Sequence, residues 1–364
     1  MTVPQREEWV RKLLELGRLV RGALLSARGH ARDMAGVAKW TSADAIYELD
    51  THVEPVIVDF CEHWSKEVPL VLIAEGIGPE GHEGKAIFPA GTPEENAQIR
   101  IIMDPIDGTR GLMYDKRPAW FLAGVAPNKG DATRLSDIMA AVQVELPVSK
   151  QTLSDVLWAV KGGGMKALRE EVRGTVFQKS HDLALRASQA ENIEHGFATV
   201  VNFFPGTKEL AARLMEEIAA TCLMERQSLD LPVAAGKSGD LRSMGFSRAV
   251  VFDDQYITTG GQLYELIAGH DRFIADLRPL LYQARGLPIG MSVHPYDMSA
   301  LLIAREAGIE ITDGLGGELD APMDVDSSIH WAGYANRKLR ARIEPVMVAT
   351  LREWLNKNEG KVQS

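Results

Sequence analysis

The spacing of apolar residues predicts helices and strands that alternate along the whole chain. Residues 6–29, 48–67 and 208–224 carry apolar side chains near the helical period. Short apolar runs that end in polar or turn residues predict strands: VPLVLIAEG, IRIIMD, WFLAGVAP, IMAAVQVELP running on to VLWAVKGGG, ATVVNFF and AVVFDD. Residues 76–97 are rich in Gly, Pro and charge, so a loop or hairpin is expected there.

The last clear unit is HPYDMSALLIAREAGIEITDGLGGELD, which predicts a helix, a stop at Gly308, a strand and a glycine turn. Strands and helices are interleaved in both halves, which favours an α+β or α/β architecture with layers of both kinds. A length of 364 residues suggests two domains. A change to a charged stretch after Gly164 places the expected boundary between 1–165 and 166–364.

Charge and cysteine content exclude several classes of protein. The formal net charge of −10 argues against non-specific binding to nucleic acid or to an anionic membrane. A small anionic substrate remains compatible with it, because a bound metal can reverse the local field. Cys61 and Cys222 form no CxxC pair and indicate no disulfide framework. Without a signal-peptide core or an apolar run of ~18 residues, a cytoplasmic protein is expected.

The stretch IIMDPIDGTRG at 101–111 places two acids on either side of a tight turn. A strand ends at Asp104, Pro105 fixes its own φ and cannot donate a backbone hydrogen bond, and Asp107 follows so that both carboxylates can face one point. Two neighbouring carboxylates repel unless a cation lies between them. Mg²⁺ prefers such oxygen ligands, and the carbonyl of Ile106 is another within reach. The pattern therefore predicts a magnesium site.

The residues after the second acid extend this hypothesis to phosphate. Gly108 and Thr109 are expected to open a helix, whose free amides suit a phosphate group. A bare DPxDG is also a common turn sequence. The full string DPIDGT after an apolar strand is more specific, and metal-held acids beside an anion-binding helix start indicate phosphate chemistry.

The string DPIDGT resembles the signature of the inositol monophosphatase superfamily, which contains inositol monophosphatases, fructose-bisphosphatases and bisphosphate nucleotidases. Three other segments resemble the superfamily in the same order: AKWTSADAIYELDTHVE with Lys39, Asp44 and Asp50, VLIAEG with Glu75, and HPYDMSALLIAREAGIEITD with Asp297. The resemblance covers most of residues 35–125 and 255–325 and is weak between about 165 and 250.

This resemblance implies an alternating α-β-α-β-α layered fold and a site for two Mg²⁺ ions. It implies a metal-binding N-terminal domain and a C-terminal domain that completes the site. The first ion would be held by Glu75, Asp104 and the Ile106 carbonyl, and the second by Asp104, Asp107 and Asp297. The implied catalytic residues, which orient and deprotonate the attacking water, are Asp50 and Thr109. The implied phosphate- and substrate-binding residues are Gly108, Thr109, Arg110 and Lys39.

Three positions depart from the superfamily pattern. Gly76 replaces a second glutamate, which leaves a third metal open, with Glu80 or Glu83 as substitutes. Gly290 stands where inositol monophosphatases carry a substrate-binding glutamate, so an inositol substrate is not supported by that residue. Arg110 is followed by glycine, as the Lys-Gly of bisphosphate nucleotidases is, and a guanidinium suits a second phosphate. A solvated surface charge explains Arg110 equally well.

We therefore expect a Mg²⁺-dependent phosphomonoesterase of the inositol monophosphatase type. Its substrate would be a small phosphorylated metabolite: an inositol phosphate, a sugar phosphate or a nucleoside bisphosphate. The resemblance also implies a homodimer and inhibition by lithium. The alternative is a catalytically weak or inactive member that binds a metabolite or regulates a process. Asp297 has a rationale of its own, because Pro295 suits a first helical position and places Asp297 in the first turn.

Overall fold

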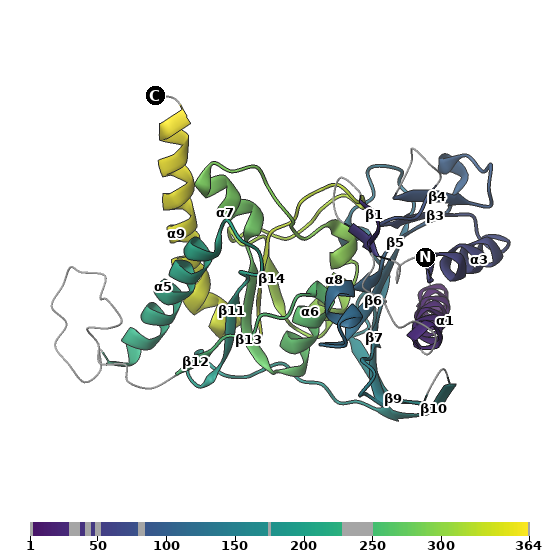
Figure 1. Cartoon of the computed structure of the whole chain (residues 1–364), viewed down its shortest axis with the longest axis horizontal. Coiled ribbons are helices and arrows are strands. Elements are labelled where there is room, and N and C mark those ends of the chain that lie inside the picture. The colour runs from purple at the N-terminus through teal and green to yellow at the C-terminus, as the bar shows by residue number, and fades with distance from the viewer. Residues whose placement is uncertain are drawn as a thin grey trace.

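A computed structural model describes residues 3–28, 37–40, 45–47, 52–78, 84–173, 176–227 and 250–362, with side chains described for 4–27, 52–78, 84–172, 179–222 and 250–357. Two mixed β-sheets organise this part of the chain, and helices lie between and outside them (Figure 1). A short antiparallel pair, β1 (Val37–Trp40) with β2 (Ala45–Tyr47), lies apart from both sheets in strand pairing.

The first sheet has eight strands in the order β10-β9-β8-β7-β6-β5-β3-β4. Its strands are β3 (Leu70–Ala74), β4 (Lys85–Phe88), β5 (Ile99–Asp107), β6 (Ala119–Pro127), β7 (Ala140–Leu146), β8 (Leu153–Val160), β9 (Met165–Arg173) and β10 (Val176–Asp182). All neighbours are antiparallel except β3 and β5. β3 and β4 form the hairpin that the turn-rich stretch predicts.

The second sheet has five strands in the order β12-β11-β13-β15-β14. They are β11 (Gly196–Val200), β12 (Val251–Phe252), β13 (Asp271–Asp276), β14 (Glu310–Thr312) and β15 (Trp331–Tyr334). β11 pairs in parallel with β12 and β13, and β15 runs antiparallel to β13 and β14. This mixture of directions suits a sheet that is covered by helices on both faces.

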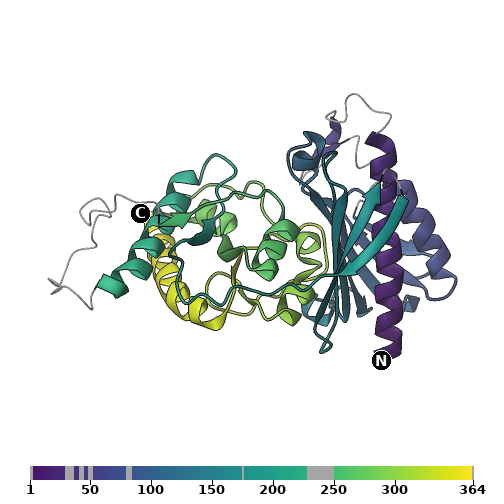
Figure 2. The same cartoon turned by 90° about the horizontal axis from the view of Figure 1, so that it is seen from below.

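The helices complete a five-layer α-β-α-β-α sandwich (Figures 1 and 2). The outer layer on the first sheet consists of α1 (Val3–Arg28) and α3 (Glu54–Ser65). The middle layer holds α6 (Thr259–Ala268) and α8 (Leu301–Glu306), whose apolar residues share one core with both sheets. The outer layer on the second sheet consists of α5 (Lys208–Gln227), α7 (Arg278–Arg285) and α9 (Arg337–Val362). The predicted layered fold is confirmed.

The strands β9 and β10 were not predicted, because they lie in the stretch that reads only as charged, and β13 and β15 were not predicted either. Glu170 on β9 is completely buried, and two arginines of α1 neutralise it. Arg18 donates to one carboxylate oxygen of Glu170 (3.0 and 2.7 Å), and Arg21 donates to the other (2.6 Å). The first sheet therefore continues to Asp182, beyond the predicted boundary at residue 165, and the division into two domains stays a proposal.

Helix bounds agree with the apolar periodicity. The predicted helix 6–29 corresponds to α1, and the predicted helix 48–67 corresponds to α3 within the described residues. Gly308, the predicted stop, follows α8 with φ of +84°. Among the described helices, none combines the length and apolar character that crossing a membrane needs.

The buried pairing of Glu170 generates a stability prediction. Replacing Glu170 by Gln leaves the guanidinium of Arg21, whose side chain is 4% exposed, without its counter-charge. We expect the free energy of unfolding to fall by about 3 kcal/mol or more in urea titrations. Glu171→Gln, at a neighbouring side chain that is 39% exposed, should change it by less than about 0.5 kcal/mol. Equal losses in the two variants would show that the pairing does not stabilise the sheet.

Candidate metal and phosphate site

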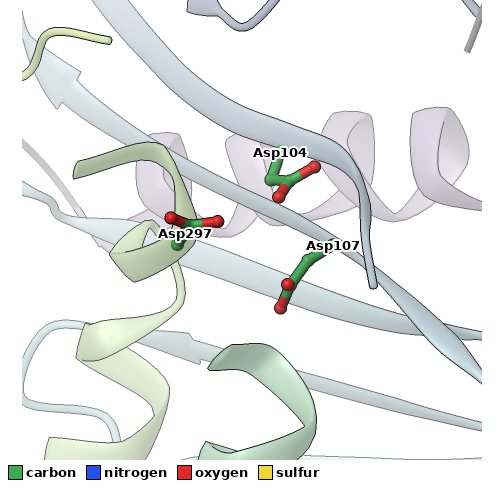
Figure 3. A group of neighbouring side chains, drawn as sticks. All are labelled: Asp104, Asp107 and Asp297. Carbon is green, nitrogen blue, oxygen red and sulfur yellow. The ribbon is translucent and has the colours of Figure 1, made fainter. Parts of the chain in front are cut away.

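Three carboxylates from two distant parts of the chain converge between the first sheet and the middle helical layer. Asp104, Asp107 and Asp297 each offer an oxygen, and these atoms all lie within 4.8 Å of one another. Figure 3 shows the three side chains around one point, two of them from β5 and one from the segment that precedes α8. Such a set of oxygen ligands suits a hard divalent cation.

A bulge in β5 puts the first two acids on the same side of the sheet. Asp104 pairs with Leu122 of β6, and Asp107 pairs with Trp120. Three steps on β5 therefore oppose two steps on β6, so β5 contains one extra residue. In a regular strand, residues three apart point to opposite faces. The extra residue cancels this alternation, and both carboxylates lie on the face that Trp120 and Leu122 share.

Asp297 lies in the first turn of a short 3₁₀ helix, Pro295–Met298, as the position of Pro295 predicts. Its Oδ2 accepts a hydrogen bond from the backbone N–H of His294 at 2.6 Å. Proline suits the start of this turn because it has no N–H to leave unpaired. The capping bond holds the Asp297 carboxylate toward β5.

Burial and mutual repulsion make this cluster unstable as three free anions. Burial raises the pKa of Asp104 well above its ordinary value, and the negative charges of Asp107, Asp297 and Glu75 raise it further. Burial likewise raises the pKa of Asp297, with Asp107 as the next cause. Burial raises the pKa of Asp107 to about 6, although hydrogen bonds from Thr258 and its neighbours oppose the shift. A cation would relieve this repulsion.

The other predicted ligands of the first metal lie beside the cluster. Glu75 directly follows β3, and it is close enough for its charge to raise the pKa of Asp104 and of Asp297. The backbone N–H of Ile106 donates to Asp104 (2.9 Å), while the carbonyl of Ile106 accepts from the hydroxyl of Thr109 (2.8 Å). A carbonyl oxygen has two lone pairs, so the Ile106 carbonyl keeps one for a cation.

The turn and short helix after β5 contain the predicted phosphate-binding residues Gly108, Thr109 and Arg110. Gly108 has φ of +97° and precedes the short helix α4 (Thr109–Met113). The helix start that the motif predicts is confirmed. Arg110 lies on this helix, and its guanidinium is 3.9 Å from the sulfur of Met291.

Several predicted residues fall outside the part that the structure describes. Asp50 and Asp44 lie outside the described residues, as do Glu80 and Glu83, the candidates for a third metal. Lys39 belongs to β1, but its side chain lies outside the described set. Their proposed roles stay predictions.

Three further residues at the site were not predicted. The hydroxyl of Thr258 donates to Asp107 at 2.6 Å, and the backbone N–H groups of Thr259 and Gly260 donate to the same carboxylate. Thr258 is the N-cap of α6. The sequence TTGG before an apolar helix is a weak signal for an N-cap, and nothing in it points toward Asp107.

Comparisons with solved structures place this arrangement in a known fold. The chain is similar to the extragenic suppressor protein SuhB of Bartonella henselae (TM-score 0.56, 17% identity, 93% of this chain and 97% of that chain). It is similar to an IMPase of Thermotoga maritima (0.56, 17%, 96% and 99%). It is also similar to the fructose-1,6-bisphosphatase of Leishmania major (0.58, 12%, 94% and 93%). No family model and no curated protein sequence matches.

The chain has the inositol monophosphatase-like fold. The resemblance that the sequence motifs predict is thus confirmed at the level of the fold, over 93 to 96% of the chain. Within this fold, the observed acidic cluster lies at the position from which the motifs predict metal binding.

Two departures from the superfamily pattern have local causes in this inositol monophosphatase-like fold. Gly76 has φ of +72°, a left-handed conformation that strains any residue with a side chain. A Cβ added at Gly290 would lie 2.9 Å from the hydroxyl of Tyr282, so a larger residue there would displace that ring. Both positions are adapted to glycine in this chain.

The raised pKa values predict how cation binding depends on pH. Carboxylates must lose their protons to bind a metal, and the pKa of Asp107 is raised to about 6. Mg²⁺ affinity should therefore rise as the pH rises from about 5 to about 8, with proton release on binding. Calorimetric titrations in two buffers of different ionisation enthalpy measure both quantities. An affinity that stays constant over this range would contradict the predicted coupling.

Proposed function

We propose that this protein is a Mg²⁺-dependent phosphatase that hydrolyses the phosphate monoester of a small metabolite. The observation that carries this proposal is the convergence of Asp104, Asp107 and Asp297 within 4.8 Å, next to the turn that begins α4. The fold supports it, since structures similar to this chain include an IMPase and a fructose-1,6-bisphosphatase.

In this proposal two ions per subunit occupy the cluster. Glu75, Asp104 and the Ile106 carbonyl hold one, and Asp104, Asp107 and Asp297 hold the other. When bound, the ions supply Lewis acidity that activates water and stabilises the leaving oxygen. Asp104 would be a ligand of both ions. Gly76 has no side-chain carboxylate for a third ion, so a third ion would need Glu80 or Glu83 as a ligand.

The chain's own groups then orient the reactants. The hydroxyl of Thr109 donates to the Ile106 carbonyl at 2.8 Å, and this bond fixes the hydroxyl for its role in orienting the attacking water, which gives up a proton. We propose that Asp50 receives this proton, as the resemblance implies. The amides of Gly108 and Thr109 bind the phosphate, and Lys39 balances its charge.

The substrate class remains a choice among inositol phosphates, sugar phosphates and nucleoside bisphosphates. Gly290 against Tyr282 argues against the inositol group, because no acidic side chain can stand there to bind hydroxyl groups. Arg110 favours a substrate with a second anionic group, such as a bisphosphate. The homodimer, the cytoplasmic location, lithium inhibition and the two-domain division stay predictions.

The alternative is a protein that binds a metabolite and catalyses little. The glycines at 76 and 290 are the observations that favour it, because each removes an acidic group that the superfamily pattern provides. A protein of this kind would bind phosphorylated ligands without releasing phosphate. Comparing ligand binding with phosphate release on the same substrates separates the two functions.

Substitution of the shared ligand provides the main test. Asp104→Asn removes a carboxylate that both ions share, and we expect phosphate release to fall at least about a thousandfold. Chelation of the metal with EDTA should abolish activity, and added Mg²⁺ should restore it. Asp131→Asn, at a side chain that is 95% exposed, should leave activity unchanged.

The assay should compare an adenosine bisphosphate, an inositol phosphate and fructose bisphosphate. Phosphate release that persists in Asp104→Asn or in excess EDTA would refute the two-metal mechanism. Tight binding with no release from a substrate panel would favour the regulatory alternative.

A further inference from the structure

The carboxylate of Asp107 is held by a helix from the other half of the chain. Oδ2 of Asp107 accepts from the Thr258 hydroxyl at 2.6 Å and from the backbone N–H of Gly260. Among the described residues, the one hydrogen bond to Oδ1 is long, 3.3 Å, from the N–H of Thr259. Since a carboxylate oxygen offers two lone pairs, Oδ2 is saturated and Oδ1 retains the capacity to bind a cation.

The hydroxyl of Thr258 is held in one orientation because it both donates and accepts a hydrogen bond. Its oxygen accepts the N–H of Gly261 at 3.0 Å as the N-cap of α6, and its hydrogen points to Asp107. Thr258 is 5% exposed, so water does not compete for these bonds. A hydroxyl constrained in this way holds the carboxylate at one rotation.

The turn that carries these donors is itself fixed to the first sheet by Gln143. This residue lies in the middle of β7, is fully buried, and donates its Nε2–H to the carbonyl of Gly260 at 2.8 Å. Gly260 is thus held on both sides, by Asp107 through its N–H and by Gln143 through its carbonyl. Within the described part of the chain, the Oε1 of Gln143 is buried without a hydrogen-bond partner, so the bond to Gly260 offsets only part of the cost of burying this amide.

Close packing leaves this turn little freedom to shift. A Cβ added at Gly260 would lie 2.6 Å from the side chain of Leu122 and 3.0 Å from Oδ2 of Asp107. A Cβ added at Gly108 would lie 3.0 Å from Thr258. The first turn of α6 and the turn after β5 are therefore closely packed at two glycines.

We propose that Thr258 and Gln143 are positioning residues that present Asp107 to a cation through Oδ1 alone. Thr258 sets the rotation of the carboxylate, and Gln143 holds the turn that carries its donors. The proposal rests on the proposed function, since it requires Asp107 to bind a metal ion. Neither residue touches the cation or the substrate.

The test measures Mg²⁺ binding directly by calorimetry, without substrate. Thr258→Val removes the donor at nearly constant volume, and the dissociation constant for Mg²⁺ should rise about tenfold or more. Thr258→Ser restores the hydroxyl and should stay within about twofold of the natural protein. Gln143→Met, which removes the amide at similar length, should weaken binding in the same direction.

Thr199→Val is the matched control. Thr199 is 2% exposed and donates to the carboxylate of Asp253 at 2.7 Å, away from the acidic cluster. The Thr199→Val variant loses the same type of hydrogen bond as Thr258→Val. The thermal unfolding temperature should therefore fall in both threonine variants, while Mg²⁺ affinity falls only in Thr258→Val.

The outcomes separate this proposal from the proposed function. If the natural protein binds no Mg²⁺, the proposed function fails, and the positioning role fails with it. If the natural protein binds Mg²⁺ and Thr258→Val binds it equally tightly, only the positioning role is overturned. Should Thr258→Val not fold, Gln143→Met decides, and unchanged affinity in that variant overturns the proposal.

Discussion

The repulsion among buried carboxylates is the constraint on which the site depends. Asp104, Asp107 and Asp297 are brought within 4.8 Å of one another, where the first two are buried and Asp297 is half-buried. Burying charges of one sign together is costly, and packing elsewhere must offset that cost. Three elements support the cluster: β5 carries two of the acids, a 3₁₀ turn carries the third, and α6 supplies hydrogen bonds.

The layered architecture explains why these groups come from both halves of the chain. The middle helical layer packs against the first sheet on one side and the second sheet on the other. Asp107 of β5 therefore contacts the N-terminal turn of α6, which belongs to this layer. The site lies between the first sheet and the middle helical layer, and packed interfaces of this kind are a common location for ligand sites.

The sequence patterns identified the three clustered acids, but they missed strand β9 and the contact of Thr258. Spacing placed Asp104 at a strand end and Asp297 in a first helical turn, whereas the resemblance to the superfamily implied that these two acids and Asp107 share a metal site. The strand in fact continues through a bulge to Asp107. β9 escaped prediction because Glu170 is buried only by pairing with Arg18 and Arg21 from α1. Thr258 escaped because its partner, Asp107, becomes a neighbour only when the sheet and α6 pack together. Periodicity cannot show such tertiary pairs.

The bulge in β5 makes chain length at this turn as important as its composition. One inserted residue lets two acids, three positions apart, share a face of the sheet. Deleting any residue between them would restore regular pleating and leave two carboxylates two positions apart on a straight strand, without the kink that aims the second at α6. Shortening this bulge would therefore disturb the direction of the Asp107 carboxylate more than exchanging a side chain within it would.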